Sequence, residues 1–290
     1  MDDPDERIKK LEEEMASPYF WDDKARAQEK MKELATLKAG LKKGAGYDGG
    51  NAIVTIFSGA GGLDAEDWTR MLYEMYVRFI ARRKWTVHTI HSHPNDHNGY
   101  RNITFEVVGK GAYGDLKHES GVHRLVRVSP FSAKKLRHTS FSLVEVVPKF
   151  KKGEGTIPDG EVKIEFSKSS GPGGQNVNKR ETAVRVMHIP TGITAHCDRE
   201  RSQVANREKA LEVLAGKVFK FREAVQGEEK EKYYISKTTE AEWGSQIRSY
   251  VLHPYKLVKD HRTNTEHKNP TQVLEEGDLD MFIERMKGKK

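Results

Sequence analysis

Ala52-Ile53-Val54-Thr55-Ile56-Phe57, together with the glycine-rich Ser58-Gly59-Ala60-Gly61-Gly62-Leu63 behind it, sets the fold class of this chain. The first segment is rich in β-branched residues and predicts a strand, and the second predicts a loop. Asp64 is the expected N-cap of the helix that follows. Apolar side chains recur on one face of that helix, so we expect it to pack on a sheet. These side chains are Trp68, Leu72, Met75 and Phe79.

Further strand signals downstream predict an α+β layer. They cover residues 85–91, 101–108 and 140–147, and residues 95–99 are typical of the turn of an antiparallel hairpin. Because strands outnumber the helices between them, a doubly wound sheet is not expected.

The rest of the chain divides into helical segments and linkers, and the length predicts two or three domains. Residues 5–44 predict two helices broken at Ser17-Pro18, since proline disfavours helix for itself and for the preceding residue. Residues 44–50 predict a linker, and residues 202–226 predict one long helix packed under a small sheet. The apolar stripe of that helix is Leu211, Leu214, Val218 and Phe221.

The composition agrees with a soluble protein that faces RNA, and the low cysteine content fits a reducing cytoplasm. The 290 residues carry a net charge of +7 with a pI near 9.2, and the mean hydropathy is −0.76. No apolar run approaches the roughly 20 residues that cross a bilayer, and the acidic start at residues 1–5 has no secretory signal. A single cysteine, Cys197, excludes an intramolecular disulfide framework and is expected to be a packing residue.

The most unusual turn is Ser169-Ser170-Gly171-Pro172-Gly173-Gly174-Gln175-Asn176-Val177-Asn178-Lys179-Arg180. Its glycines let backbone N–H groups approach a reacting centre, where one well-aimed donor to an oxyanion contributes about a hundredfold in rate. Gln175 is neutral and cannot act as a general base. Lys179, Arg180 and Arg185 suit phosphate neighbours. The alternative is a glycine-rich surface hairpin with solvated charges.

Residues 123–141 form a second candidate site, a basic loop with a proline-stiffened tip. A hydroxyl, an aromatic ring and an imidazole there could bond to and stack on unpaired RNA bases. The alternative is a basic hairpin whose Phe131 packs into the core.

Four histidines crowd the hairpin near residue 95, a spacing that could also hold a metal. Because such spacings are frequent by chance, we expect solvent-exposed loop histidines and no metal or other cofactor. The four are His88, His91, His93 and His97.

The Gly173-Gly174-Gln175 (GGQ) turn and residues 182–193 together resemble the peptidyl-tRNA hydrolysis domain of class I bacterial peptide chain release factors and of their ribosome-rescue relatives. The resemblance implies that Gly173, Gly174 and Gln175 are catalytic, with the Gln175 N–H assisting the attack of water on the ester. It also implies N5-methylation of Gln175 by a glutamine methyltransferase, and contacts to rRNA or tRNA. The residues implied in those contacts are Lys179, Arg180 and Arg185.

Ser129-Pro130-Phe131 (SPF), followed by Arg137-His138-Thr139-Ser140-Phe141, is similar to the codon-reading motif of the release factor 2 branch, which terminates at UAA and UGA. This resemblance implies that Ser129 forms a hydrogen bond with the second codon base, whether adenine or guanine. It also implies that His138 stacks among the codon bases and that Thr139 forms hydrogen bonds with them. The loop at residues 61–64 meets the first uridine. The implied codon-binding set is Gly62, Asp64, Ser129, Pro130, Phe131, Arg137, His138 and Thr139.

Residues 243–252 resemble a third family segment, in which Trp243 acts as a switch; the residues alone favour a buried anchor. The implied fold is α+β and multidomain. It comprises a shortened N-terminal helical pair (1–45), an α/β stop-codon recognition domain (46–155), a small mixed-sheet GGQ domain with a long packing helix (156–238), and a C-terminal segment packing on the recognition domain (239–290).

The resemblance implies a cytoplasmic monomer, without membrane contact, that terminates translation at UAA or UGA. Its partners would be the 70S ribosome (16S and 23S rRNA), the mRNA stop codon and P-site peptidyl-tRNA, so hydrolysis would occur only in the peptidyl transferase centre. The short first domain leaves dependence on the recycling GTPase release factor open. Because residues 133–136 and Asp64 depart from the family pattern, a rescue hydrolase without codon dependence stays an alternative. A non-catalytic RNA-binding regulator is the third hypothesis.

Overall fold

The computed structural model describes residues 30, 47–150, 157–168, 181–200, 202–226 and 245–288. The chain divides into two compact units, Met1–Gly49 and Gly50–Lys290. The predicted helical pair at 1–45 lies outside the described residues, except for the helical Lys30. Within the described part of the chain, no helix combines the length and the apolar character needed to span a membrane.

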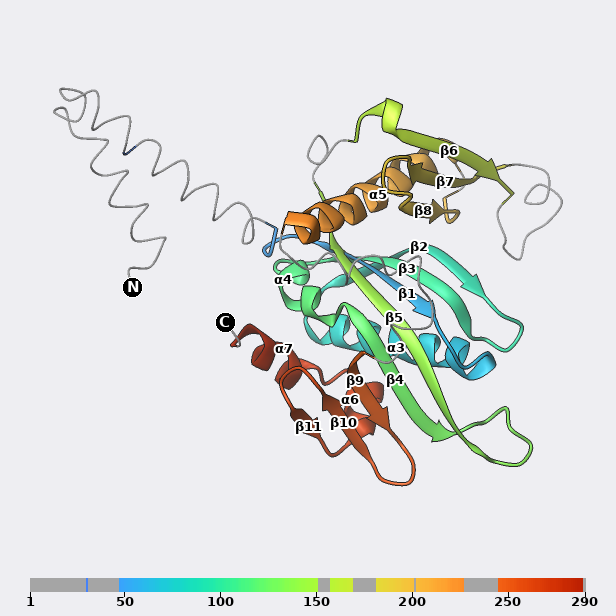
Figure 1. Ribbon diagram of the computed structural model, residues 1–290, viewed down its shortest axis with the longest axis vertical. Coiled ribbons are helices and arrows are strands. Elements are labelled where there is room, and N and C mark those ends of the chain that lie inside the picture. Colours follow the sequence, from blue (N-terminus) through green and yellow to red (C-terminus); the bar gives the residue numbers. More distant parts are fainter. Residues whose placement is uncertain are drawn as a thin grey trace. The chain divides into compact units, whose positions relative to one another are not determined.

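An eight-stranded sheet forms the centre of the second unit (Figure 1). Its strand order is β11-β10-β9-β4-β5-β1-β3-β2, and every neighbouring pair is antiparallel except β4 and β9. The strands are β1 (Ala52–Ser58), β2 (Thr86–Pro94), β3 (Tyr100–Val108), β4 (Gly121–Val128), β5 (Arg137–Pro148), β9 (Gln246–Val251), β10 (Leu257–Asp260) and β11 (Thr265–His267).

Helix α3 (Leu63–Arg82) packs on one face of this sheet, and its predicted apolar stripe is confirmed: all four side chains are fully buried. Trp68 Nε1 donates to the carbonyl of His123 at 3.0 Å, which fixes the helix to β4. The predicted N-cap is wrong. Gly62 is the N-cap residue, with φ 57°, a conformation that favours glycine. Asp64 lies inside the helix, and its carboxylate contacts Ser129 and His138 instead of capping the helix.

Short helices complete this unit. They are α4 (Ala112–Leu116), the 3₁₀ turn η2 (Lys117–Glu119), α6 (Pro270–Glu276) and α7 (Asp280–Lys287). Helix α6 packs on α3 and ends at Gly277, where φ is 67° and a Cβ would lie 2.4 Å from the backbone nitrogen of Phe79. Only glycine fits this close approach without displacing α3.

A second, three-stranded sheet has the order β6-β7-β8. Its strands are β6 (Val162–Ser167), β7 (Ala183–His188) and β8 (Thr194–Cys197), with the 3₁₀ turn η3 (Asp159–Glu161) before them. Both pairings are antiparallel, so the predicted mixed sheet is wrong for this domain. The parallel pair belongs to the large sheet because β9 returns to β4 over a long connection.

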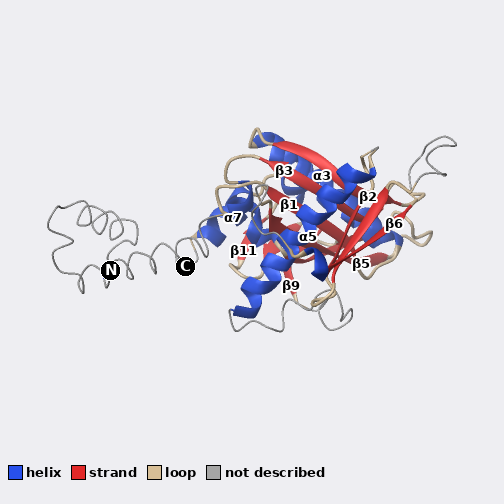
Figure 2. Ribbon diagram, turned by 90° about the horizontal axis from the view of Figure 1, so that it is seen from above, coloured by secondary structure: helices blue, strands red, loops and turns tan. Residues whose placement is uncertain are grey.

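Helix α5 (Gln203–Gln226) covers the three-stranded sheet (Figures 1 and 2). Leu214 and Val218 are buried as predicted, but Leu211 and Phe221 are only half-buried. The core beneath α5 also contains Ile53 of β1 and further side chains of β2 and β5. Since α3 covers the opposite face of β1, residues 52–56 are buried without alternation.

A buried ionic network joins β9 to η2 and α3. Arg248 donates to both carboxylate oxygens of Glu119 at 2.6 and 2.7 Å, and to Asp260 at 3.1 Å. Tyr76 donates to Glu119 at 3.1 Å, and His123 Nε2 lies 3.0 Å from the Glu119 carbonyl. Each of these buried charges therefore has an opposite charge or a hydrogen-bond partner, as burial requires.

Acid is expected to destabilise the fold through His123. Burial, with Arg248 adding to it, lowers the pKa of His123 from 6.5 to about 4. The unfolded chain binds more protons between these two values, so the free energy of unfolding falls as the pH falls from 6.5 to about 4, by up to about 3 kcal/mol. Chemical denaturation at several pH values measures the slope. The substitution His123→Gln should reduce the slope of the unfolding free energy against pH, whereas His88→Gln, at an exposed position, should leave the slope unchanged. Equal slopes for the two variants would show that His123 does not cause the acid sensitivity.

Candidate functional site

The segment Ser129 to Leu136, called the tip below, joins β4 to β5. Ser129 N donates to the Leu136 carbonyl at 3.0 Å and closes the turn, while Lys135 takes a positive φ of 51°. The Phe131 ring is 38% exposed, so the alternative in which it packs into the core is wrong. An exposed ring beside exposed lysines can stack on a base while the cations contact phosphates.

A single carboxylate organises the base of the tip. Asp64 Oδ2 accepts from Ser129 Oγ at 2.7 Å and lies 2.8 Å from His138 Nδ1. Arg127 Nη2 lies 3.5 Å from the other Asp64 oxygen and also donates to Asp67. We call these five residues the Asp64 cluster. Asp64 is only 4% exposed, and a shielded carboxylate holds its donors more firmly than a solvated one.

The Asp64 cluster fixes the orientation of one side chain of the tip, Ser129, and of one on β5, His138. The Ser129 hydroxyl donates to Asp64 and accepts from Phe131 N at 3.1 Å, so its rotor has one preferred direction. His138 is held through Nδ1, while its side chain remains 42% exposed. A pre-oriented hydroxyl and imidazole lose little entropy when they meet a ligand.

The glycine loop before α3 lies against β5 beside the tip. Gly59 N donates to the Phe141 carbonyl at 2.8 Å. At Gly61, with φ 133°, a Cβ would lie 3.0 Å from Ser140 Oγ and 3.2 Å from Ser140 Cα. This close approach brings Gly62 and the first turn of α3 to the base of the tip.

The structure thus gathers the predicted codon-binding residues at one end of the large sheet. Asp64 and Ser129 are buried at the base of the tip, whereas Phe131 and Thr139 are exposed to solvent. The gathered set is Gly62, Asp64, Ser129, Pro130, Phe131, Arg137, His138 and Thr139.

The predicted hydrolysis residues are not tested in this way. Gly173, Gly174, Gln175, Lys179, Arg180 and Trp243 lie outside the described residues. Arg185 is described, and it is exposed on β7 opposite Glu165 and His196. Ser167 at the end of β6 pairs with Ala183 at the start of β7, so the chain leaves and re-enters this sheet at one point.

Asp67 and Arg127 were missed by the sequence analysis. Asp67 follows Asp64 by three residues on a helix, a spacing that puts both carboxylates on one face and that could have identified it. The prediction of exposed histidines is wrong for His91, which is 8% exposed, because residues 196–198 lie beside it.

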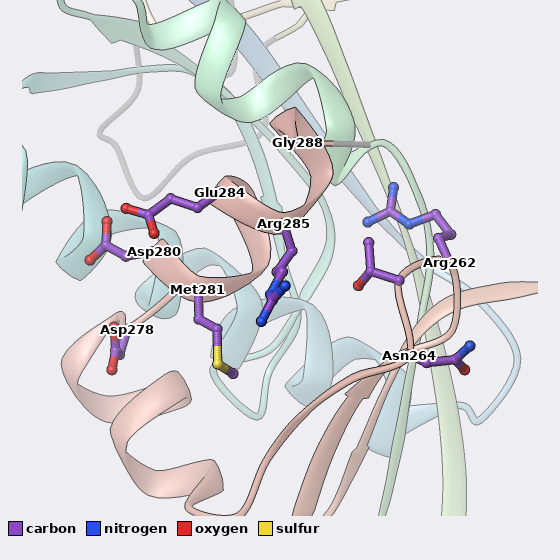
Figure 3. Close-up of a pocket in the computed structure, with 9 residues that line it drawn as sticks. Arg262, Asn264, Asp278, Asp280, Met281, Glu284, Arg285 and Gly288 are labelled. Carbon is purple, nitrogen blue, oxygen red and sulfur yellow. The ribbon is translucent and has the colours of Figure 1, made fainter. Parts of the chain in front are cut away.

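The pocket in Figure 3 lies away from the tip and has a volume of about 930 Å³. Two of its charged residues have partners within the protein: Asp280 pairs with Arg82 and Arg83 at 2.9 and 2.7 Å, and Arg262 pairs with Asp260 at 2.7 Å. None of its lining residues belongs to the tip or to the Asp64 cluster, so it adds no chemistry to that site. The lining residues are Arg262, Thr263, Asn264, Asp278, Asp280, Met281, Glu284, Arg285 and Gly288.

Known proteins share both the fold and these segments. A family model described as the PCRF domain matches residues 37–144, and one described as the RF-1 domain matches residues 151–262. Peptide chain release factor 2 of Clostridium perfringens (strain SM101 / Type A) is 46% identical over 253 residues, covering 87% of this chain and 69% of that protein. The protein of the same name from Exiguobacterium sp. is 37% identical over 329 residues, and the match covers 96% of this chain and 89% of that protein.

A solved structure agrees with these relatives. RF2 of Thermus thermophilus matches with a TM-score of 0.75 and 34% identity, covering all of this chain and 97% of that one. The fold and site define a class: the chain belongs to the peptide chain release factor family, as its sequence motifs predicted. The relatives to which it is similar carry the name peptide chain release factor 2.

Proposed function

We propose that this chain ends translation by recognising UAA or UGA in the ribosomal A site and promoting hydrolysis of the peptidyl-tRNA ester. The observation that carries the proposal is the Asp64 cluster, which orients Ser129 at the start of the tip and His138 on β5, while the tip also exposes the aromatic ring of Phe131. Hydroxyl, imidazole and ring together supply the hydrogen bonds and stacking by which unpaired RNA bases are recognised.

The Ser129 hydroxyl suits a purine at the second codon position. It already donates to Asp64 and accepts from Phe131 N, which leaves one lone pair for a base. The amino group of adenine would occupy that lone pair without any rearrangement. The carbonyl oxygen of guanine would require the hydroxyl to turn and release Asp64. Both purines are accepted in this account, with adenine favoured.

Asp64→Asn should therefore narrow the preference for UAA over UGA. The hydroxyl bond to a charged carboxylate is about 1 kcal/mol stronger than one to an amide, so the ratio of kcat/KM values should fall about fivefold. Peptide release at the two codons measures the ratio. Asp67→Asn is the matched control, since Asp67 pairs with Arg127 and does not contact Ser129. An unchanged ratio, or an equal change in both variants, would contradict the account.

In this proposal the GGQ turn, in the connection between β6 and β7, assists the attack of water on the ester. Its backbone N–H at Gln175 would donate to the developing oxyanion, while Gly173 and Gly174 allow the close approach. Support comes from the β6–β7 pairing, which anchors both ends of this connection on a sheet backed by α5.

The proposed partners follow from this mechanism and from the net charge of +7. They are the 70S ribosome through its 16S and 23S rRNA, the stop codon, and peptidyl-tRNA in the P site. A glutamine methyltransferase would modify Gln175. We further propose that the chain works as a monomer in the cytoplasm.

The decisive experiment is release of labelled peptide from ribosome complexes with UAA, UGA, UAG, a sense codon or an empty A site. Rapid release confined to UAA and UGA is the expected result. Release at sense codons or at the empty site would overturn codon dependence and indicate a rescue hydrolase. Binding without release at any codon would remove the hydrolytic part of the proposal.

A further inference from the structure

Three side chains of types that can bind a metal ion meet where β2 lies beside β8, away from the tip (Figure 1). His91 comes from β2, His196 from β8, and Asp198 follows the end of β8. His91 Nδ1 lies 2.8 Å from Asp198 Oδ1, and the His91 and His196 rings are 4.5 Å apart between centroids. One ligand atom of each residue lies within 4.8 Å of the others.

Strand alternation sets the direction of these side chains. His196 and Cys197 are neighbours on β8 and therefore point to opposite faces. The Cys197 thiol faces the core and lies 3.2 Å from Asn206 Oδ1, so it takes no part in the cluster. His196 faces His91, whose side chain is 10% exposed, and Asp198, whose side chain is 5% exposed. Two of the three side chains of the cluster are therefore largely shielded from solvent.

Two imidazoles and one carboxylate are a donor set that zinc and neighbouring divalent transition metals prefer. An imidazole must be neutral to bind a metal.

We propose that His91, His196 and Asp198 bind one divalent transition-metal ion, best matched by zinc. The ion replaces the hydrogen bond between His91 Nδ1 and Asp198 Oδ1, the proton of that bond passes to solvent, and a water completes four-coordination. Ligand distances of about 2.0–2.2 Å place the donor atoms about 3.4 Å apart, so rotations of the side chains suffice. The ion then cross-links β2 to the end of β8, segments about a hundred residues apart in the chain.

The test is titration of the full chain, freed of metal by a chelator that is then removed, with Zn²⁺ in a calorimeter. One saturable site is expected, with Co²⁺ absorption bands reporting four-coordination. His196→Gln and Asp198→Asn should each weaken binding at least about tenfold, the minimum effect seen when even an outer partner of a metal ligand is lost. His88→Gln is the matched control, because His88 is an exposed histidine on the same strand, and it should bind like the unmodified chain.

Thermal melts separate a lost site from a lost fold. Zn²⁺ should raise the Tm of the unmodified chain and of His88→Gln but not that of His196→Gln, while all three melt alike without metal. Absence of saturable binding below about 100 μM Zn²⁺ would overturn the proposal. Equal affinity of the unmodified chain and the His196→Gln and Asp198→Asn variants would overturn it as well, since the ion would then lie elsewhere.

Discussion

Replacing Arg248 by methionine is expected to lower the free energy of unfolding by about 3–5 kcal/mol, the usual cost of removing one partner of a buried ion pair. Arg248 is fully buried and bonds Glu119 and Asp260, and its guanidinium lies 4.3 Å from the centre of the Phe282 ring. Burial opposes ionisation of Glu119, but the charge and hydrogen bonds of Arg248, together with His123 and Arg262, hold the pKa of that carboxyl below its usual value. Without this cation the buried Glu119 loses its opposite charge, whereas Asp260 keeps Arg262 at 2.7 Å.

Urea denaturation measures this effect, and Arg101→Met is the matched control. The Arg101 side chain is 59% exposed, and its ion pair with Glu66 is long, at 3.4 Å between Nε and Oε1. Its loss should therefore lower the free energy of unfolding by less than about 1 kcal/mol. The double variant Glu119→Gln with Arg248→Met should be less destabilised than Arg248→Met alone, since one unpaired charge is gone. Equal costs for Arg248→Met and Arg101→Met would show that the network contributes little.

Gly174→Ala is expected to reduce stop-codon-dependent peptide release at least about a hundredfold, the effect of losing one oxyanion donor. On the proposed mechanism, a methyl group in the GGQ turn keeps the Gln175 N–H from its close approach to the ester. Single-turnover hydrolysis measures the loss. Binding to ribosomes carrying UAA should remain, because the tip is unchanged.

Gly160→Ala provides the control for this substitution. Gly160 lies before β6, and a Cβ there would meet nothing within 4 Å. This variant should release peptide at the unmodified rate. If Gly174→Ala also released peptide normally, the GGQ turn would serve only as a contact, and a non-catalytic role would be favoured.

The periodic spacing of apolar residues correctly predicted helix α3 and the face by which it packs on the sheet. The stripe Trp68, Leu72, Met75 and Phe79 is spaced for one helical face, and all four are buried. The N-cap prediction for Asp64 was wrong because a glycine with positive φ can start the helix, which freed the carboxylate for the tip. His91 was assigned to the surface because the residues that cover it lie about a hundred positions downstream.

The site was predictable as a set of residues but not as an arrangement. The resemblance located Ser129 and His138 by matching motif residues, and it located Asp64 by position although that residue departs from the family pattern. That Ser129 and His138 share one oxygen of Asp64 depends on the approach of α3 to β5, which is a tertiary contact. No spacing rule links residues 64, 129 and 138.

The parallel pairing of β9 with β4 has a consequence for how the chain must be made. β4 carries the tip, and it is an interior strand only because Gln246–Val251 occupies its outer side. During synthesis β4 and β5 leave the ribosome about a hundred residues before β9 does, and until then β4 presents unpaired backbone groups. At a synthesis rate of about 5–20 residues per second, this edge is open for several seconds to some twenty seconds. Premature truncation upstream of residue 246 would make that exposure permanent, and such fragments should aggregate through β4.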